Sequence, residues 1–165
     1  NIINQEGIRL GLMEGVPMLR LHDQQGKAHE VHAQMLGPLP QGRWCHLAVQ
    51  VTSGNLTFFL DGKRYDTFAW PGKAAWGTGD WTIGANSRES QPGNRFFAGK
   101  LDGIRISSVE RYTRMTYPVT RRHLPDRSTH LLLNMDDMRV HWLYDESRNA
   151  AHPMIHGDAV LVAEP

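Results

Sequence analysis

Residues 44–63, with the sequence WCHLAVQVTSGNLTFFLDGK, predict the class of fold. Apolar residues alternate with other residues in both halves of this stretch, as they do where one face of a β-sheet is buried. Ser53, Gly54 and Asn55 separate the two predicted strands. Asp61 and Gly62 then predict a tight hairpin turn, because glycine accepts the positive φ that such a turn needs.

The rest of the chain continues this pattern of short strands and frequent turns. Sixteen glycines and nine prolines interrupt the apolar runs, and helical periodicity is nearly absent apart from one possible helical turn at residues 110–116. We therefore expect an all-β fold, a two-sheet antiparallel sandwich or jelly roll, as a single domain over residues 1–165. The other strands are predicted at residues 8–12, 18–22, 30–35, 63–70, 81–84, 96–106, 131–135 and 141–144, and a hairpin-like pattern at residues 152–162.

The overall composition narrows the classes of function. A formal net charge of +1 over 165 residues gives no basic excess for gripping phosphates, so nucleic acid and anionic membranes are not expected partners. No apolar run is long enough to span a bilayer. Cys45 is the single cysteine, which excludes an intrachain disulfide and predicts a buried, unreactive thiol. The opening residue, Asn1, suggests that the natural start is missing, so no targeting segment can be read.

Five motifs in sequence order resemble the bacterial laminin G-like members of the concanavalin A-like lectin/glucanase superfamily. They are WCHLA at residues 44–48, LDGK at 60–63, IG at 83–84, FAGKLDGIRIS at 97–107, and the closing segment 145–157. The resemblance implies two stacked antiparallel sheets that lack the family's usual first strand. It also implies a module of a larger protein that is secreted, periplasmic or at the cell surface. It implies little about function, because this fold hosts lectins, adhesion modules and glycosidases.

Aromatic residues around a glycine-rich loop are the best sign of a ligand. Trp70, Trp76 and Trp81 flank this loop together with Tyr65, and aromatic faces stack well on sugar rings. The neighbouring polar loop, residues 86–94, offers hydrogen-bonding side chains such as Asn86 and Arg88. The alternative is that Trp70 and Trp81 belong to the core and only Trp76 is displayed.

Two aspartates are candidates for a structural calcium ion, which carboxylate and amide oxygens bind well. Asp102 shares strand parity with Ile104 and Ile106, which would turn its carboxylate towards the core, where a charge needs a partner. Asp145 is the second candidate, in a loop that also carries Ser147 and Asn149. A calcium ion bound there would raise the melting temperature. The alternative is that Asp102 caps backbone N–H groups or pairs with an arginine.

These patterns favour a non-enzymatic recognition module for carbohydrate or for a protein partner, including other domains of the same protein. A first alternative is an assembly domain that docks a neighbour through a free sheet edge. A second alternative is a degenerate glycosidase, which would need two carboxylates converging on one sugar bond. Asp136 and Asp137 are adjacent and would face opposite ways on a strand, so no such pair is visible.

Overall fold

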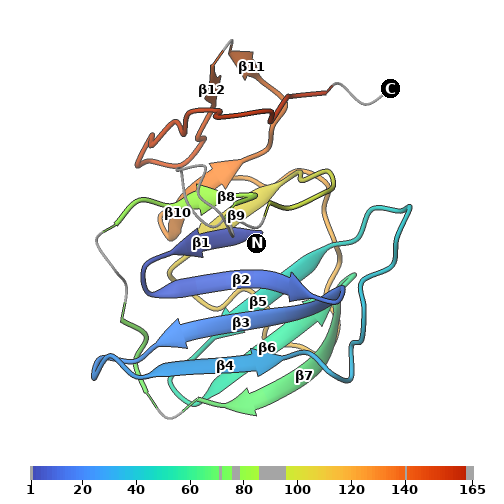
Figure 1. Ribbon diagram of the computed structural model, residues 1–165, viewed down its shortest axis with the longest axis vertical. Coiled ribbons are helices and arrows are strands. Elements are labelled where there is room, and N and C mark those ends of the chain that lie inside the picture. Colours follow the sequence, from blue (N-terminus) through green and yellow to red (C-terminus); the bar gives the residue numbers. More distant parts are fainter. Residues whose placement is uncertain (1, 71, 76–78, 86–95, 140, 163–165) are drawn as a thin grey trace. The chain divides into compact units, whose positions relative to one another are not determined.

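The computed structural model describes residues 2–70, 72–75, 79–85, 96–139 and 141–162, and the regular elements in these ranges are all β-strands (Figure 1). This confirms the predicted all-β class. No helix among these residues is long and apolar enough to cross a membrane. The chain divides into two compact units. The first comprises Asn1–Ala98 and Arg111–Val119, and the second comprises Gly99–Glu110 and Thr120–Pro165.

The first unit contains a five-stranded antiparallel sheet in the order β4-β3-β2-β1-β8. Strands β2 and β3 are joined by a tight turn in which Glu14 and Gly15 have φ values of 53° and 83°. This combination is typical of a two-residue hairpin, whose twist matches that of the strands. The strand bounds are β1 (Ile3–Gln5), β2 (Ile8–Met13), β3 (Val16–His22), β4 (Ala28–His32) and β8 (Thr82–Ile83).

The second sheet of this unit is the predicted central hairpin extended by one strand, in the order β5-β6-β7. It consists of β5 (Leu47–Val51), β6 (Asn55–Leu60) and β7 (Lys63–Ala69). Leu60 pairs with Lys63 across the turn, and Asp61 and Gly62 have φ values of 48° and 78°. The sequence prediction of a tight turn at this position is confirmed.

The hydrophobic core lies between these two sheets. Leu19 and Leu21 of β3 pack in one cluster with Leu56 and Phe58 of β6, and Trp70 completes it after β7. Each of these side chains is at most 3% exposed. Two antiparallel sheets that share one core form a sandwich, consistent with the predicted jelly roll. The prediction that a usual first strand is missing stays a prediction.

The opposite face of the three-stranded sheet is covered by residues 111–119. Phe59 is fully buried beneath Tyr112 and Tyr117, whose rings stack with centroids 3.7 Å apart. Gln50 of β5 fixes the segment, because its side-chain oxygen accepts hydrogen bonds from the backbone N–H groups of Arg111 and Tyr112 at 3.1 Å. The predicted helical turn at residues 110–116 is therefore wrong, because the backbone here bonds to the sheet instead of to itself.

The second unit contains two antiparallel pairs, β9 (Ile104–Ser107) with β10 (Thr129–Leu133), and β11 (Met138–Arg139) with β12 (Trp142–Leu143). Leu132 and Leu133 are fully buried within it. The strand expected at residues 96–106 is much shorter in the structure. Gly103 has a φ of 59°, which ends the extended backbone and leaves only residues 104–107 in the strand. Within residues 152–162, Met154 forms an isolated bridge to Trp142, and no strand is present in the described part. The single-domain prediction stays a prediction.

Candidate functional site

The predicted aromatic ligand site is only partly described by the structure, because Trp76, Asn86 and Arg88 lie outside the described residues. Trp70 is 3% exposed and packs edge-on against His29, with ring centroids 5.1 Å apart, so the structure places it in the core with no face free for a sugar. Tyr65 is half-buried, with the Lys63 ammonium 5.4 Å from its ring centroid. Trp81, the expected core residue of the alternative, is instead 38% exposed.

The expectation that Asp102 points into the core is wrong. Its side chain is exposed, and it precedes β9 instead of belonging to it. The reason is Gly103, whose positive φ interrupts the alternation on which the prediction depended. A sequence pattern of Asp-Gly-Ile therefore does not fix the direction of the aspartate.

Asp145 is only 1% exposed, and protein donors occupy its carboxylate. Oδ1 accepts hydrogen bonds from the N–H groups of Leu132 and Ser147, and Oδ2 accepts them from the Ser147 hydroxyl and the Ala151 N–H, at 2.8 to 2.9 Å. Burial alone would raise the pKa of Asp145, but these hydrogen bonds stabilise the charged form and lower the pKa below its usual value of 3.8.

No cluster of three or more His, Cys, Asp or Glu side chains that could hold a metal ion occurs among the described residues. Both oxygens of Asp145 already have protein partners, and Asp102 faces solvent. Calcium binding therefore stays a prediction, which melting curves in calcium and in chelator would test.

The structure assembles a different set of polar side chains on the outer face of the five-stranded sheet. Arg9 of β2 lies directly opposite Arg20 of β3, and the register continues to Asn4 on one side and to Glu30 on the other. Thr82 of β8 pairs with Asn4. Because directly paired residues of antiparallel strands share a face, five side chains form one line across all five strands. We call this line the arginine rung: Thr82, Asn4, Arg9, Arg20 and Glu30.

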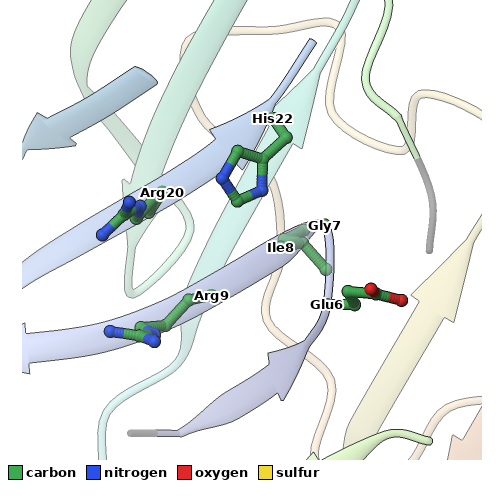
Figure 2. A pocket seen from close by; sticks show the side chains of 6 residues that line it. All are labelled: Glu6, Gly7, Ile8, Arg9, Arg20 and His22. Carbon is green, nitrogen blue, oxygen red and sulfur yellow. The ribbon is translucent and has the colours of Figure 1, made fainter. Parts of the chain in front are cut away.

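A shallow pocket of about 150 Å³ lies beside the arginine rung. Figure 2 shows the side chains of Arg9 and Arg20 extending in the same direction from neighbouring strands, with the His22 ring farther along β3. The carboxylate of Glu6 points away from both guanidinium groups (Figure 2). The lining residues are Glu6, Gly7, Ile8, Arg9, Arg20 and His22.

The two guanidinium groups have few partners in the part of the chain that the structure describes. The Arg9 Nε donates one hydrogen bond to Asn4 Oδ1 at 3.3 Å, and the Arg20 guanidinium makes no hydrogen bond or ion pair with another described residue. Glu30, the cross-strand neighbour of Arg20, contacts His32 instead, at 3.1 Å. The pocket thus presents N–H donors and positive charge.

The sequence contains a signal for the arginine pair that lies outside the five family motifs. The turn at Glu14 and Gly15 fixes the hairpin register, and that register places Arg9 opposite Arg20. Each arginine stands between two apolar residues of its strand, as in Ile8-Arg9-Leu10 and Leu19-Arg20-Leu21. Counting outward from the turn therefore pairs the two arginines from the sequence alone.

The fold and this face together define a β-sandwich domain with a polar pocket on one sheet. Residues 2–112 match the family model Laminin_G_3, described as the concanavalin A-like lectin/glucanases superfamily, and the chain belongs to this family. Neither a curated protein nor a solved structure matches the chain. The closing segment 145–157 lies beyond the matched residues, so its resemblance to the family stays a prediction.

Proposed function

We propose that this protein is a non-catalytic carbohydrate-recognition module, and that the outer face of the five-stranded sheet carries its binding site. The observation that supports this function is the arginine rung with its adjoining pocket, in a domain of a superfamily named for lectins and glucanases. Sugars present dense hydroxyl groups, and half-buried arginines with unused N–H donors are suited to bind them.

Non-catalytic binding is favoured over glycoside hydrolysis by the carboxylates of the second unit. Asp136 and Glu146 both form ion pairs with the guanidinium of Arg122. A retaining glycosidase needs two carboxylates that face one sugar bond across roughly 5 Å. Release of reducing sugar that disappears in a Glu146→Gln variant would overturn the non-catalytic proposal.

A glycan and polysaccharide array tests the proposal directly. We expect binding to at least one saccharide class, and we expect Arg20→Gln to lose it. The array should include Trp76→Ala, because the prediction of a displayed tryptophan concerns a different surface. If binding is lost only in Trp76→Ala, the recognition function stands but its site is not the arginine rung.

A protein partner is the second candidate, and the edge position of β4 favours it. This strand has no further strand beside it in the described part of the sheet, so its backbone could pair with an incoming strand. A blank glycan array with well-folded protein, together with association through residues 28–32, would support this alternative. We place either function in an exported protein, as the family resemblance implies.

A further inference from the structure

The arginine rung holds two guanidinium groups side by side, and we infer that they bind the carboxylate or sulfate groups of an acidic polysaccharide. This inference rests on the proposed carbohydrate-recognition function and names the class of sugar for that same site. It goes beyond the family match, which gives no ligand.

The arginine pair carries an electrostatic cost, because neither guanidinium forms an ion pair with another described residue. Like charges directly opposite each other on neighbouring strands destabilise a sheet. The Glu30 carboxylate contacts the His32 ring, and the carboxylate of Glu6 points away from both guanidinium groups (Figure 2). A bound anion would reduce the repulsion between the two guanidinium groups, so we expect the site to bind a negatively charged ligand.

The geometry also suits an oxyanion. A guanidinium has five N–H donors in a planar fork that matches carboxylate and sulfate oxygens. Arg9 uses one of these donors within the protein, and Arg20 uses none with the described residues. His22 lies two residues after Arg20 on the same face and has no hydrogen-bonding partner for its ring among the described residues.

A neutral sugar fits the site less well. Sugar rings without charge commonly stack on an aromatic face, and the arginine rung contains no aromatic side chain. A pocket of about 150 Å³ is below the usual range for a whole ligand of drug size, so it would hold one sugar unit or its charged substituent. Charge-assisted hydrogen bonds are about twice as strong as neutral ones, which favours the acidic sugar further.

The test uses the full chain and two matched pairs of oligosaccharides in titration calorimetry. The first pair is oligogalacturonate with free carboxylates and the same oligosaccharide as its methyl ester. The second pair is a sulfated cello-oligosaccharide and its unsulfated form. We expect each acidic member of a pair to bind about tenfold or more tightly than its neutral counterpart. Comparing the two acidic members distinguishes a carboxylate ligand from a sulfate ligand.

Three substitutions define the site. Arg20→Gln is expected to weaken acidic binding at least about tenfold, and Arg20→Lys to give an intermediate loss, because lysine keeps the charge but not the fork. Glu30→Gln is expected to strengthen acidic binding, since it removes a negative charge beside Arg20. Arg127→Gln is the matched control: it removes the same charge from an exposed position in the second unit and should leave the affinity unchanged.

The melting temperature of the unliganded protein separates a binding role from a structural one. Removing one of two opposed like charges should leave the melting temperature of Arg20→Gln equal to or higher than that of the unmodified protein. A large decrease together with lost binding would mean that Arg20 supports the fold, and the inference would be overturned.

The remaining outcomes separate this inference from the proposed function. Equal affinity for the free acid and its ester, with both lost in Arg20→Gln, would overturn the acidic class and leave the recognition function standing. If none of the oligosaccharides binds and the array is also blank, the proposed function fails, and the acidic class with it.

Discussion

Asp145 is a charged side chain that the protein buries almost completely. Isolated burial of a carboxylate is costly, and the structure offsets the cost with four hydrogen-bond donors from Leu132, Ser147 and Ala151. These donors come from three places in the sequence, so the single side chain ties the end of β10 to the loop that follows β12. We therefore assign Asp145 a structural role.

Replacing Asp145 by asparagine should lower the free energy of unfolding by roughly 2–4 kcal/mol. The substitution removes the charge and turns an amide donor towards groups that are themselves donors. Urea denaturation at neutral pH measures the loss. Asp158→Asn is the matched control, because Asp158 is exposed and makes no hydrogen bond with another described residue. A similar loss in both variants would contradict the assigned role.

The stabilising effect of Asp145 should also depend on pH in a defined direction. Because the folded-state pKa lies below the usual value of 3.8, the unfolded chain takes up a proton first as the pH falls. The contribution is complete above this value and is lost as the pH decreases through it towards the lower folded-state pKa. The difference in stability between the unmodified protein and Asp145→Asn should therefore decrease from pH 6 to pH 3. Each pKa unit between the folded and unfolded states contributes ~1.4 kcal/mol to this decrease. A constant difference would argue against this mechanism.

The hairpin between β6 and β7 shows how one turn organises a larger element. Gly62 has a positive φ, its carbonyl oxygen accepts a hydrogen bond from the Tyr117 N–H at 2.8 Å, and residues 111–119 lie against the sheet beside it. A Cβ atom at position 62 would come within 2.2 Å of the Tyr117 carbonyl oxygen. The turn thus needs glycine for its backbone angle and for the close approach of a second segment.

Substituting alanine at two glycines separates these requirements. Gly26→Ala should cost about 1 kcal/mol, because Gly26 has a φ of 77° but no neighbour within 4 Å. Gly62→Ala has the same angular cost plus the displacement of Tyr117, so we expect a total loss of about 3 kcal/mol. Thermal unfolding of both variants measures the difference. Equal losses of stability would mean that residues 111–119 move away from a Cβ atom at position 62 at little cost.

Local elements of this fold were predictable, and long-range ones were not. The strands around Gly62 and around Gly15 follow from alternation and turn residues that lie next to each other in sequence. The pairing of β1 with β8 joins residues nearly eighty positions apart. The hydrogen bond that the Gln50 side chain donates to the Tyr112 carbonyl oxygen joins positions separated by 62 residues. No local pattern specifies such partners, because many strands have similar apolar faces.

In the candidate site, too, the local contacts were predictable and the long-range ones were not. The pairing of Arg9 with Arg20 was predictable from a local turn, whereas its extension to Thr82 depends on the distant pairing of β1 with β8. The direction of Asp102 was predicted wrongly because a single glycine conformation changed the parity of a strand. Residues 111–119 belong to the first unit although the chain on both sides belongs to the second, and composition gives no sign of this exchange.

The whole molecule has a formal net charge of only +1, so it offers little overall attraction for an acidic ligand, and we expect the charged contact to come from the local arginine pair. Exposed charges are screened over about 10 Å at 0.1 M salt and about 3 Å at 1 M. We therefore expect the affinity for the acidic oligosaccharide to fall as salt is raised between these concentrations, and to fall much less in Arg20→Gln. Calorimetry across a salt series measures both slopes. Parallel slopes would place the charged contact elsewhere on the protein.

The arginine rung has a further consequence, which concerns the direction of a bound chain. Neighbouring strands are about 4.8 Å apart, so side chains from five strands mark a line of about 19 Å with an even spacing. An extended polysaccharide repeats its sugar units at a comparable interval. A chain that crosses the strands at right angles would therefore meet a new side chain at each unit. Acidic groups on two consecutive units would lie beside Arg9 and Arg20, so the strand spacing would select ligands with that charge repeat.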